Sequence, residues 1–167
     1  MLKILMTTFL LISCAQGKSE GLNIPIGWRL PTEAETTQDW RINDKNKFLM
    51  KNADFNGDGI IDTVQVYVKN TGNVFAIFAH VSNHKAIKTI KLEEYEIQQL
   101  ENIGVNLIKS GKYLTACGKG YYTCDTKNSK YVVVKNTGID IFSWEQGNSI
   151  LNWDSHTQMF LETPMSD

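Results

Sequence analysis

The most distinctive residues of the sequence are oxygen-bearing side chains at fixed spacing in one short stretch. They are Asp54, Asn56, Asp58 and Asp62, at positions 1, 3, 5 and 9 of that stretch. Calcium takes about six to eight oxygen ligands in a loose geometry, which such a loop can wrap around one point. Gly59 at position 6 permits the sharp turn, and Ile60 at position 7 offers its backbone carbonyl. The stretch 54–62 therefore predicts a structural Ca²⁺ site, and the alternative is a polar turn that holds no ion.

An EF-hand interpretation of this loop fails at two points. The twelfth position, where an EF-hand places a bidentate glutamate, holds Gln65. The alternating residues after Asp62 also predict a strand where an EF-hand needs a helix. The stretch is instead similar to the D-x-[DN]-x-D-G-x-x-D loops of FG-GAP (integrin-type) repeats, which lead into a strand. That family builds β-propellers from several repeats, and this chain has one copy, so the resemblance implies the calcium loop without the propeller.

The beginning of the chain predicts export. A short cationic start precedes the mostly apolar run Ile4–Ile12, which is too short to span a bilayer. Leu11-Ile12-Ser13-Cys14 resembles the bacterial lipobox, which implies a signal peptide over 1–13 and acylation of the Cys14 thiol. The alternative is a free cysteine in an ordinary strand. Ala15 stands where an aspartate would retain such a lipoprotein at the inner membrane, so the resemblance implies the outer membrane, facing the periplasm.

The remaining cysteines form an even set. With Cys14 lipidated, Cys117 and Cys124 are left in an oxidising compartment, and glycines between them let the chain turn back. A zinc site would need two further ligands, and no histidine lies nearby in the sequence. A redox-active pair is normally spaced C-x-x-C. A structural disulfide is therefore favoured over both alternatives.

The spacing of apolar residues predicts mainly strands. Residues 62–69 alternate between apolar and polar or aromatic side chains, which is the pattern of a half-buried strand. Two short helices are expected, one after Thr32 with Glu35 at the capping-box spacing, and one over 93–103 with Gly104 as its C-cap. The predicted strands are 47–52, 62–69, 74–81, 87–92, 131–135, 139–144, 149–153 and 158–162.

Turns rich in Gly, Asn, Asp and Ser separate these strands, which favours an antiparallel meander. The sequence Val-Lys-Asn-Thr-Gly occurs at 68–72 and again at 134–138, either as a duplicated hairpin or as shared turn chemistry. We expect an α+β fold, mainly antiparallel β (meander or sandwich-like), with one or two short helices. The expected organisation is a lipid-anchored tether over 14–23 and a single β-rich domain over 24–167, a length that suits one core.

Other motifs do not complete a catalytic set. Ser82-Asn-His-Lys85 matches S-x-x-K, but no S-D-N sequence follows it. The three histidines are not at metal-ligand spacing, so each is expected to be solvent-facing or hydrogen-bonded. The four tryptophans are expected in the core in preference to a ligand cage. With 17 basic and 18 acidic residues, the overall charge does not favour nucleic acid as a partner.

The sequence favours a binding protein over an enzyme. Export, small size and a scaffold held by a disulfide and calcium suit a cell-envelope module that holds a protein partner, for example an immunity protein that neutralises an antibacterial toxin in the periplasm. The chain also resembles small bacterial lipoproteins through Gly27–Pro31, Thr115–Tyr121 and Trp153-Asp154, a resemblance that implies no activity. The alternative is an envelope hydrolase acting on cell-wall or surface polymer, whose paired carboxylates only the fold can bring together.

Overall fold

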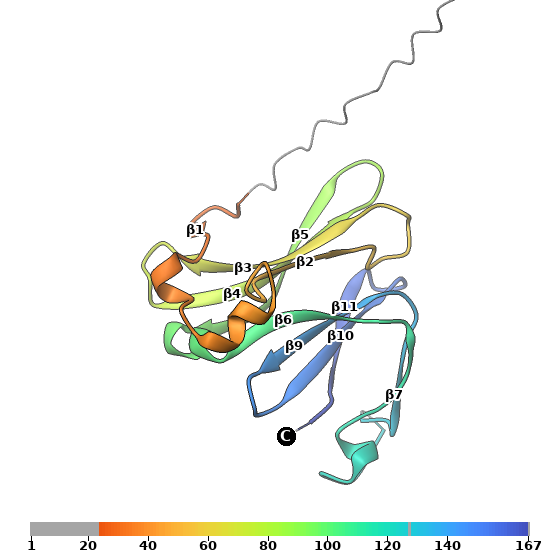
Figure 1. Ribbon diagram of the computed structural model, residues 1–167. Coiled ribbons are helices and arrows are strands. Elements are labelled where there is room, and N and C mark those ends of the chain that lie inside the picture. The colour runs from red at the N-terminus through yellow and green to blue at the C-terminus, as the bar shows by residue number, and fades with distance from the viewer. Residues whose placement is uncertain (1–23, 127, 167) are drawn as a thin grey trace, which may run out of the picture.

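The computed structural model describes residues 24–126 and 128–166 (Figure 1). The predicted signal peptide, the lipidation site Cys14 and the tether 14–23 lie outside the described residues. Two antiparallel sheets and a two-stranded ribbon make up the described part, so the expectation of a mainly antiparallel β protein is confirmed. In these ranges no helix has the length and apolar character needed to cross a membrane.

The first sheet has five strands, and β3 is at its centre. Its strands are β1 (Trp28–Arg29), β2 (Met50–Ala53), β3 (Asp62–Lys69), β4 (Val74–Ser82) and β5 (Ile87–Glu96). One edge of β3 pairs with β4, and the other pairs with β1 and β2 in turn. The predicted turn between β3 and β4 is confirmed, with Gly72 at a φ of 75° and its N–H donating to the Lys69 carbonyl at 2.7 Å.

The second sheet has the strand order β11-β10-β9-β6, and the ribbon joins β7 to β8. Its strands are β6 (Ile103–Ile108), β9 (Gly138–Ser143), β10 (Asn148–Asp154) and β11 (Met159–Pro164). The ribbon strands are β7 (Gly111–Leu114) and β8 (Tyr131–Val134). Every pairing between these strands is antiparallel. The strands β6 and β7 and the two-residue β1 are additions to the strands that the sequence predicted.

The main core lies between the two sheets. The valines of β3 contact apolar side chains of the second sheet, and all of them are buried. The residues from the second sheet are Val105, Ile139, Ile141 and Leu151. The other face of β3 is covered too, because Gln65 and Tyr67 are also buried and Trp28 packs edge-on against Phe78 at 5.1 Å. The strand predicted to be half-buried is therefore buried on both faces.

The helical segments are shorter than predicted. The described residues contain 3₁₀ helices and no α-helix: η1 (Glu33–Glu35), η2 (Asp39–Asn43), η3 (Ile97–Glu101) and η4 (Cys117–Lys119). The turn predicted after Thr32 is present as η1. Glu35 accepts hydrogen bonds from the Thr32 backbone N–H (2.8 Å) and hydroxyl (3.0 Å), so the predicted capping pair is in contact.

The helix predicted over 93–103 is wrong. Residues 93–96 continue β5 as a partner of β4, and only the five residues of η3 turn before β6 begins. Gly104, predicted to end the helix, lies inside β6. A Cβ at this position would stand 2.7 Å from Cζ of Phe142. The missing side chain therefore lets the Phe142 ring lie against the strand.

A buried tryptophan and a buried arginine fasten η2 to the sheets. Trp40 is buried and stacks on the partly exposed Trp144, with ring centroids 5.2 Å apart. The fully buried Arg41 donates to the carbonyls of Lys47 (2.8 Å) and Ile103 (2.8 Å), and burial lowers the pKa of its guanidinium to about 10. Trp40 thus has the core position that was expected for the four tryptophans, whereas Trp28 and Trp153 are partly buried and Trp144 is exposed, so the expectation is wrong for Trp144.

Candidate functional site

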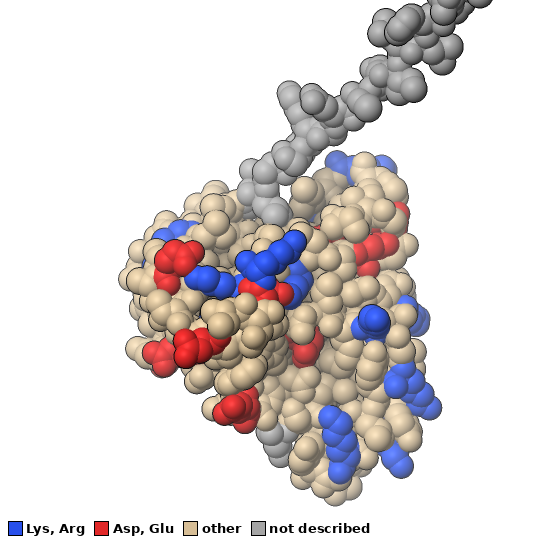
Figure 2. Space-filling view, in the orientation of Figure 1, with Lys and Arg blue, Asp and Glu red and all other residues tan. Residues whose placement is uncertain are grey.

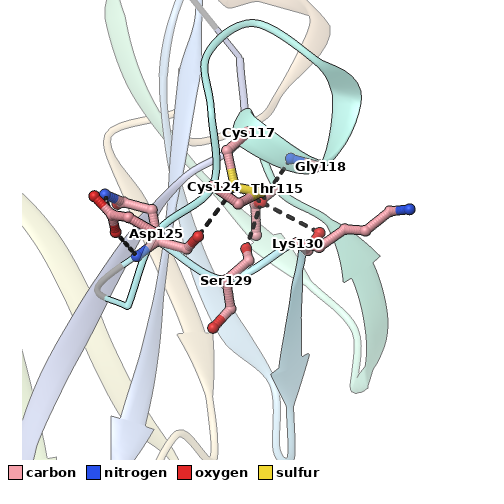
Figure 3. Close-up of a disulfide and its surroundings, with 8 residues drawn as sticks. Thr115, Cys117, Gly118, Cys124, Asp125, Ser129 and Lys130 are labelled. Carbon is pink, nitrogen blue, oxygen red and sulfur yellow. Dashed lines mark hydrogen bonds between the residues drawn. A yellow bond between two sulfur atoms is a disulfide. The ribbon is translucent and has the colours of Figure 1, made fainter.

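The Cys117–Cys124 disulfide predicted from the sequence is present, with Cα atoms 5.1 Å apart (Figure 3). It closes a loop between β7 and β8. Buried Thr115 fastens the base of this loop, since its hydroxyl donates to the Ser129 carbonyl (2.7 Å) and accepts from the Gly118 N–H (3.1 Å). The segment 115–130 is therefore closed by a covalent bond and by hydrogen bonds at its base.

The β7–β8 ribbon packs on the outer face of the second sheet. Val134 of β8 forms a small buried cluster with Ile150 of β10 and Met165. Leu151, the next residue of β10, belongs to the main core, so Ile150 points away from the first sheet. The alternation of β8 then turns Tyr131 and Val133 toward solvent, where they are 42% and 57% exposed.

A groove of about 410 Å³ runs between β8 and β11. One side is formed by β8 and the disulfide loop, and the other by side chains of β10 and β11. The β8 side contributes Tyr122, Asn128, Ser129, Tyr131, Val132 and Val133, and the sheet side contributes Asn152, Leu161, Glu162, Thr163 and Pro164.

Exposed apolar side chains gather around this groove. We call them the ribbon surface: Tyr122, Tyr131, Val133 and Leu161 line the groove, while Leu114 is exposed on β7 opposite Tyr131 and Tyr121 is exposed on the disulfide loop next to Tyr122. Single exposed apolar residues are common on proteins, but a group around a groove marks a place where another molecule binds. The ribbon surface is therefore the strongest candidate binding site in the described part of the chain.

The same region is cationic, although the whole chain carries a formal charge of −1. Residues 109–135 contain six lysines and one aspartate. Lys112 and Lys130 place their ammonium groups 4.2 Å and 5.7 Å from the centre of the Tyr131 ring. Figure 2 shows basic side chains gathered at the lower right of the molecule, over the ribbon and η4. The numbers of acidic and basic residues are nearly equal in the whole chain, but basic residues outnumber acidic ones at this end of the fold.

The predicted calcium loop lies between β2 and β3 and is organised around Asp54. The Asp54 carboxylate accepts the backbone N–H groups of Gly57 (2.7 Å), Asp58 (3.2 Å) and Gly59 (2.8 Å). Two local turns follow, in which Asn56 Oδ1 accepts from Asp58 N–H and Asp58 Oδ1 accepts from Ile60 N–H, each at 2.9 Å. The predicted sharp turn is present, since Gly59 has a φ of 84°.

Asp62 has a different environment from the other acids of the loop. It is buried, and its Oδ1 accepts both the backbone N–H (2.8 Å) and the hydroxyl (3.0 Å) of Ser82. Its Oδ2 accepts the Phe55 N–H at 2.9 Å. Burial raises the pKa of Asp62, and these hydrogen bonds act in the opposite direction. The carboxylate thus joins the loop to the end of β4.

Two of the predicted calcium ligands keep acceptor capacity in the loop. A carboxylate has about four acceptor sites, so Asp54 and Asp58 retain capacity for an ion beside their backbone donors. Asp62 would have to release a donor to bind an ion. In the ranges 24–126 and 128–166, no three His, Cys, Asp or Glu side chains are grouped as a metal site. Ligation by Asp54, Asn56, Asp58, Ile60 and Asp62 stays a prediction.

Asn136 contacts this loop, which the sequence did not indicate. It comes from the second Val-Lys-Asn-Thr-Gly stretch, which is not a hairpin because β8 pairs with β7 while β9 pairs with β6 and β10. Its Nδ2 donates to the Phe55 carbonyl at 3.1 Å, and a Cβ on Gly57 would lie 2.8 Å from that nitrogen. The duplicated-hairpin interpretation is therefore wrong. The second copy, residues 134–138, instead contacts the loop 54–62 through Asn136.

The buried histidine is part of a hydrogen-bonded network inside the first sheet. His80 Nε2 lies 2.9 Å from the Tyr67 hydroxyl, and Nδ1 lies 3.1 Å from the Thr89 hydroxyl. Burial lowers the pKa of His80 and raises that of Tyr67. The expectation of a hydrogen-bonded histidine is confirmed at this position.

One carboxylate pair forms only in the fold. Burial raises the pKa of Glu93 of β5, and the charge and hydrogen bonding of Glu162 of β11 raise it further. The two carboxyl groups of a glycosidase stand about 5 to 9.5 Å apart, which leaves room for the sugar or a water. Glu93 and Glu162 are an interacting carboxyl pair, and the hydrolase alternative stays a prediction.

Comparison of the chain with protein-family models, with curated proteins and with solved structures gave no match. The class of protein therefore follows from its fold and its candidate site. This is an antiparallel β protein in which a disulfide-closed ribbon presents an apolar and cationic surface.

Proposed function

We propose that this chain is a protein-binding lipoprotein of the bacterial cell envelope, anchored through Cys14 in the outer membrane and facing the periplasm. The observation that carries the binding role is the ribbon surface, where exposed tyrosines and aliphatic side chains border a groove. Aromatic residues are enriched at protein interfaces because they bury a large area and keep a polar tip. This surface therefore suits a protein partner.

The way the surface is held supports stoichiometric binding. The disulfide and the Thr115 hydrogen bonds restrain the loop that carries Tyr121 and Tyr122 before any partner arrives. Restraint of this kind lowers the conformational entropy lost on binding, which improves affinity without new contacts. In this proposal the partner is held and thereby neutralised or positioned, and no bond is broken.

We also propose that Ca²⁺ stabilises the scaffold at the loop 54–62. Asp54, Asn56, Asp58 and the Ile60 carbonyl would hold it, and Asp62 would join them by giving up a hydrogen bond to Phe55 or Ser82. Bound calcium would give the clustered carboxylates a shared positive partner and lock the approach of the chain into β3. Its role is structural and lies outside the ribbon surface.

Site-specific photo-cross-linking tests the binding role. A photoreactive phenylalanine derivative would replace Tyr121 in the full chain, expressed in its own cell envelope. The matched control carries the same group at Ile42, an exposed residue of η2. We expect a discrete cross-linked protein from position 121 alone. Equal cross-linking from both positions, or none from position 121, would contradict the proposal.

An immunity role is the specific form of this proposal in which the cross-linked partner is an antibacterial toxin. Cells that express the chain would then survive the toxin, and cells that express a ribbon-surface variant would not. An envelope-assembly protein as partner would favour a structural role. Robust cleavage of purified peptidoglycan by the pure domain would overturn the binding proposal and favour the hydrolase.

A further inference from the structure

We propose that the partner binds as an added β-strand along the open edge of β8, and that the added strand is acidic. This inference rests on the proposed protein-binding function and adds the conformation and the charge of the partner segment. Three observations support it: the backbone N–H and C=O groups of β8 that do not bond to β7, the groove beside β8, and the lysines around this strand.

In the described ranges, β8 pairs with β7 alone, so its other edge faces the groove. One hydrogen bond shows which residues of β8 bond to β7: the Thr115 N–H donates to the Lys130 carbonyl at 3.2 Å. Hydrogen-bonded and non-hydrogen-bonded pairs alternate along an antiparallel ladder. Tyr131 and Val133 are therefore in non-hydrogen-bonded pairs with β7, and their N–H and C=O groups point to the groove.

The groove provides space for a strand beside this edge. A neighbouring strand lies about 4.8 Å away in the direction of the hydrogen bonds. A strand added there would enter the groove, whose side opposite β8 is lined by Asn152, Leu161 and Thr163. Main-chain hydrogen bonds to Tyr131 and Val133 would then supply affinity, while side chains over Leu161 and beside Tyr131 would supply specificity.

The charges around the edge select the partner. Lys112 and Lys130 flank Tyr131, and Lys109, Lys119 and Lys135 are exposed in the same stretch of chain, whereas the groove lining holds an acidic side chain, Glu162. A strand with glutamate or aspartate at alternate positions would bring opposite charges close to these lysines, and such electrostatic complementarity favours association. A second copy of this ribbon would instead bring lysine against lysine, and edge lysines commonly oppose such self-pairing. The geometry thus points to a different, acidic chain.

An anionic membrane surface would also attract lysines and tyrosines. A bilayer offers no regular row of donors and acceptors to the N–H and C=O groups of Tyr131 and Val133, whereas a strand does. The open edge therefore favours a protein segment, and vesicles enter the experiment as a separate arm.

The probe is a synthetic peptide of about ten residues, a usual upper length for a strand, in which glutamate alternates with valine. A matched peptide carries lysine in place of glutamate. Amide hydrogen exchange of the isotope-labelled domain is followed by NMR with each peptide and with vesicles of phosphatidylglycerol. We expect the acidic peptide alone to slow exchange at the amides of Tyr131 and Val133.

Variants separate strand addition from simple charge attraction. Val133→Pro removes an N–H that faces the groove and leaves the β7 ladder bonds in place, so peptide affinity should fall about tenfold or more. Lys112→Glu with Lys130→Glu should weaken binding by a similar factor of about ten, through charge alone. The matched control, Lys45→Glu with Lys85→Glu, reverses two exposed lysines elsewhere and should leave affinity unchanged.

Several outcomes would overturn the inference. The inference is wrong if the acidic peptide fails to protect the two amides, if the control pair weakens binding as much as the ribbon pair, or if only vesicles protect the edge. If Val133→Pro does not fold, judged by its melting curve, the exchange data and the charge pairs still decide the result. If position 121 cross-links a partner equally well in Val133→Pro, strand addition is wrong while the protein-binding function stands.

Discussion

The carboxylate of Asp62 accepts both the backbone N–H (2.8 Å) and the hydroxyl (3.0 Å) of Ser82. Asp62 begins β3 and Ser82 ends β4, so the contact joins the start and the end of the hairpin. The same carboxylate accepts the Phe55 N–H from within the loop. One side chain therefore links the predicted calcium loop to the central hairpin through hydrogen bonds.

Replacing Asp62 should destabilise the fold. In Asp62→Ala, donors of Phe55 and Ser82 lose their acceptor at a buried site, which should lower the free energy of unfolding by about 2 to 3 kcal/mol. Urea unfolding measures this quantity. Asp39→Ala at an exposed position should change it by no more than about 0.5 kcal/mol. Equal midpoints for the two variants would show that the Asp62 contacts do not support the loop.

Calcium should raise the melting temperature of the wild-type protein. With a dissociation constant on the order of 10⁻⁴ to 10⁻³ M, a hundredfold excess would stabilise the fold by about 2.7 kcal/mol. Asp58→Ala should abolish the increase in melting temperature, and Asp39→Ala should retain it. Mg²⁺ should raise the melting temperature less than Ca²⁺ because it demands tighter octahedral geometry. Calorimetry with and without a chelator measures the effect. Superimposable wild-type curves would mean that the loop is a hydrogen-bonded turn alone.

The Glu93–Glu162 contact predicts a pH dependence of stability. The pKa of Glu93 is raised above its ordinary value of 4.5, so the folded state binds this proton more tightly than the unfolded state does. The resulting stabilisation is complete below about pH 4.5 and is lost as the pH rises through the raised pKa.

Glu93→Gln should therefore be more stable than wild type at pH 7, by up to about 1 kcal/mol after solvent screening, and lose this advantage near pH 4. Thermal melts across this pH range measure the difference. Glu101→Gln, at an exposed position, is the matched control and should follow wild type. An advantage for Glu93→Gln that is the same at every pH would exclude repulsion from Glu162 as its cause.

Loss of the disulfide should weaken both the fold and the binding surface. The double variant Cys117→Ser with Cys124→Ser opens a loop of sequence separation 7, which should reduce the free energy of unfolding by about 2 to 3 kcal/mol. Cross-linking from position 121 should fall as well, because Tyr121 loses its restraint. Mass spectrometry of the unreduced mature protein should find the two cysteine peptides joined, and free thiols at both positions would refute the bridge in the cell.

The anchor makes a prediction for residues outside the described ranges. A fatty-acid probe supplied to growing cells should label the wild-type protein and leave Cys14→Ser unlabelled, because acylation needs the thiol. Cys117→Ser should retain the label, which controls for a general effect of losing a cysteine. Equal labelling of wild type and Cys14→Ser would refute lipidation at this residue.

The sequence predicted the hairpin strands because their signals are local. Alternation over 62–69 coincides with β3, and Gly72 supplies the positive φ that the turn requires. A helix was wrongly predicted over 93–103 because Ile97, Leu100 and Ile103 are at helical spacing. Pairing with β4 holds residues 93–96 extended, and five residues form the 3₁₀ helix η3. Ile103 begins β6, whose partner β9 lies more distant in the sequence.

For the site, the sequence by itself determined which groups are available: the acids of the loop 54–62, the cysteine pair and the lysines of 109–135. Only the tertiary structure decided what they contact. It directed Asp62 to Ser82 and brought Asn136 to the loop, and it placed the open edge of β8 beside β11. The reason is physical, since sheet packing joins residues far apart in the chain, and the spacing of nearby residues carries no information about those distant partners.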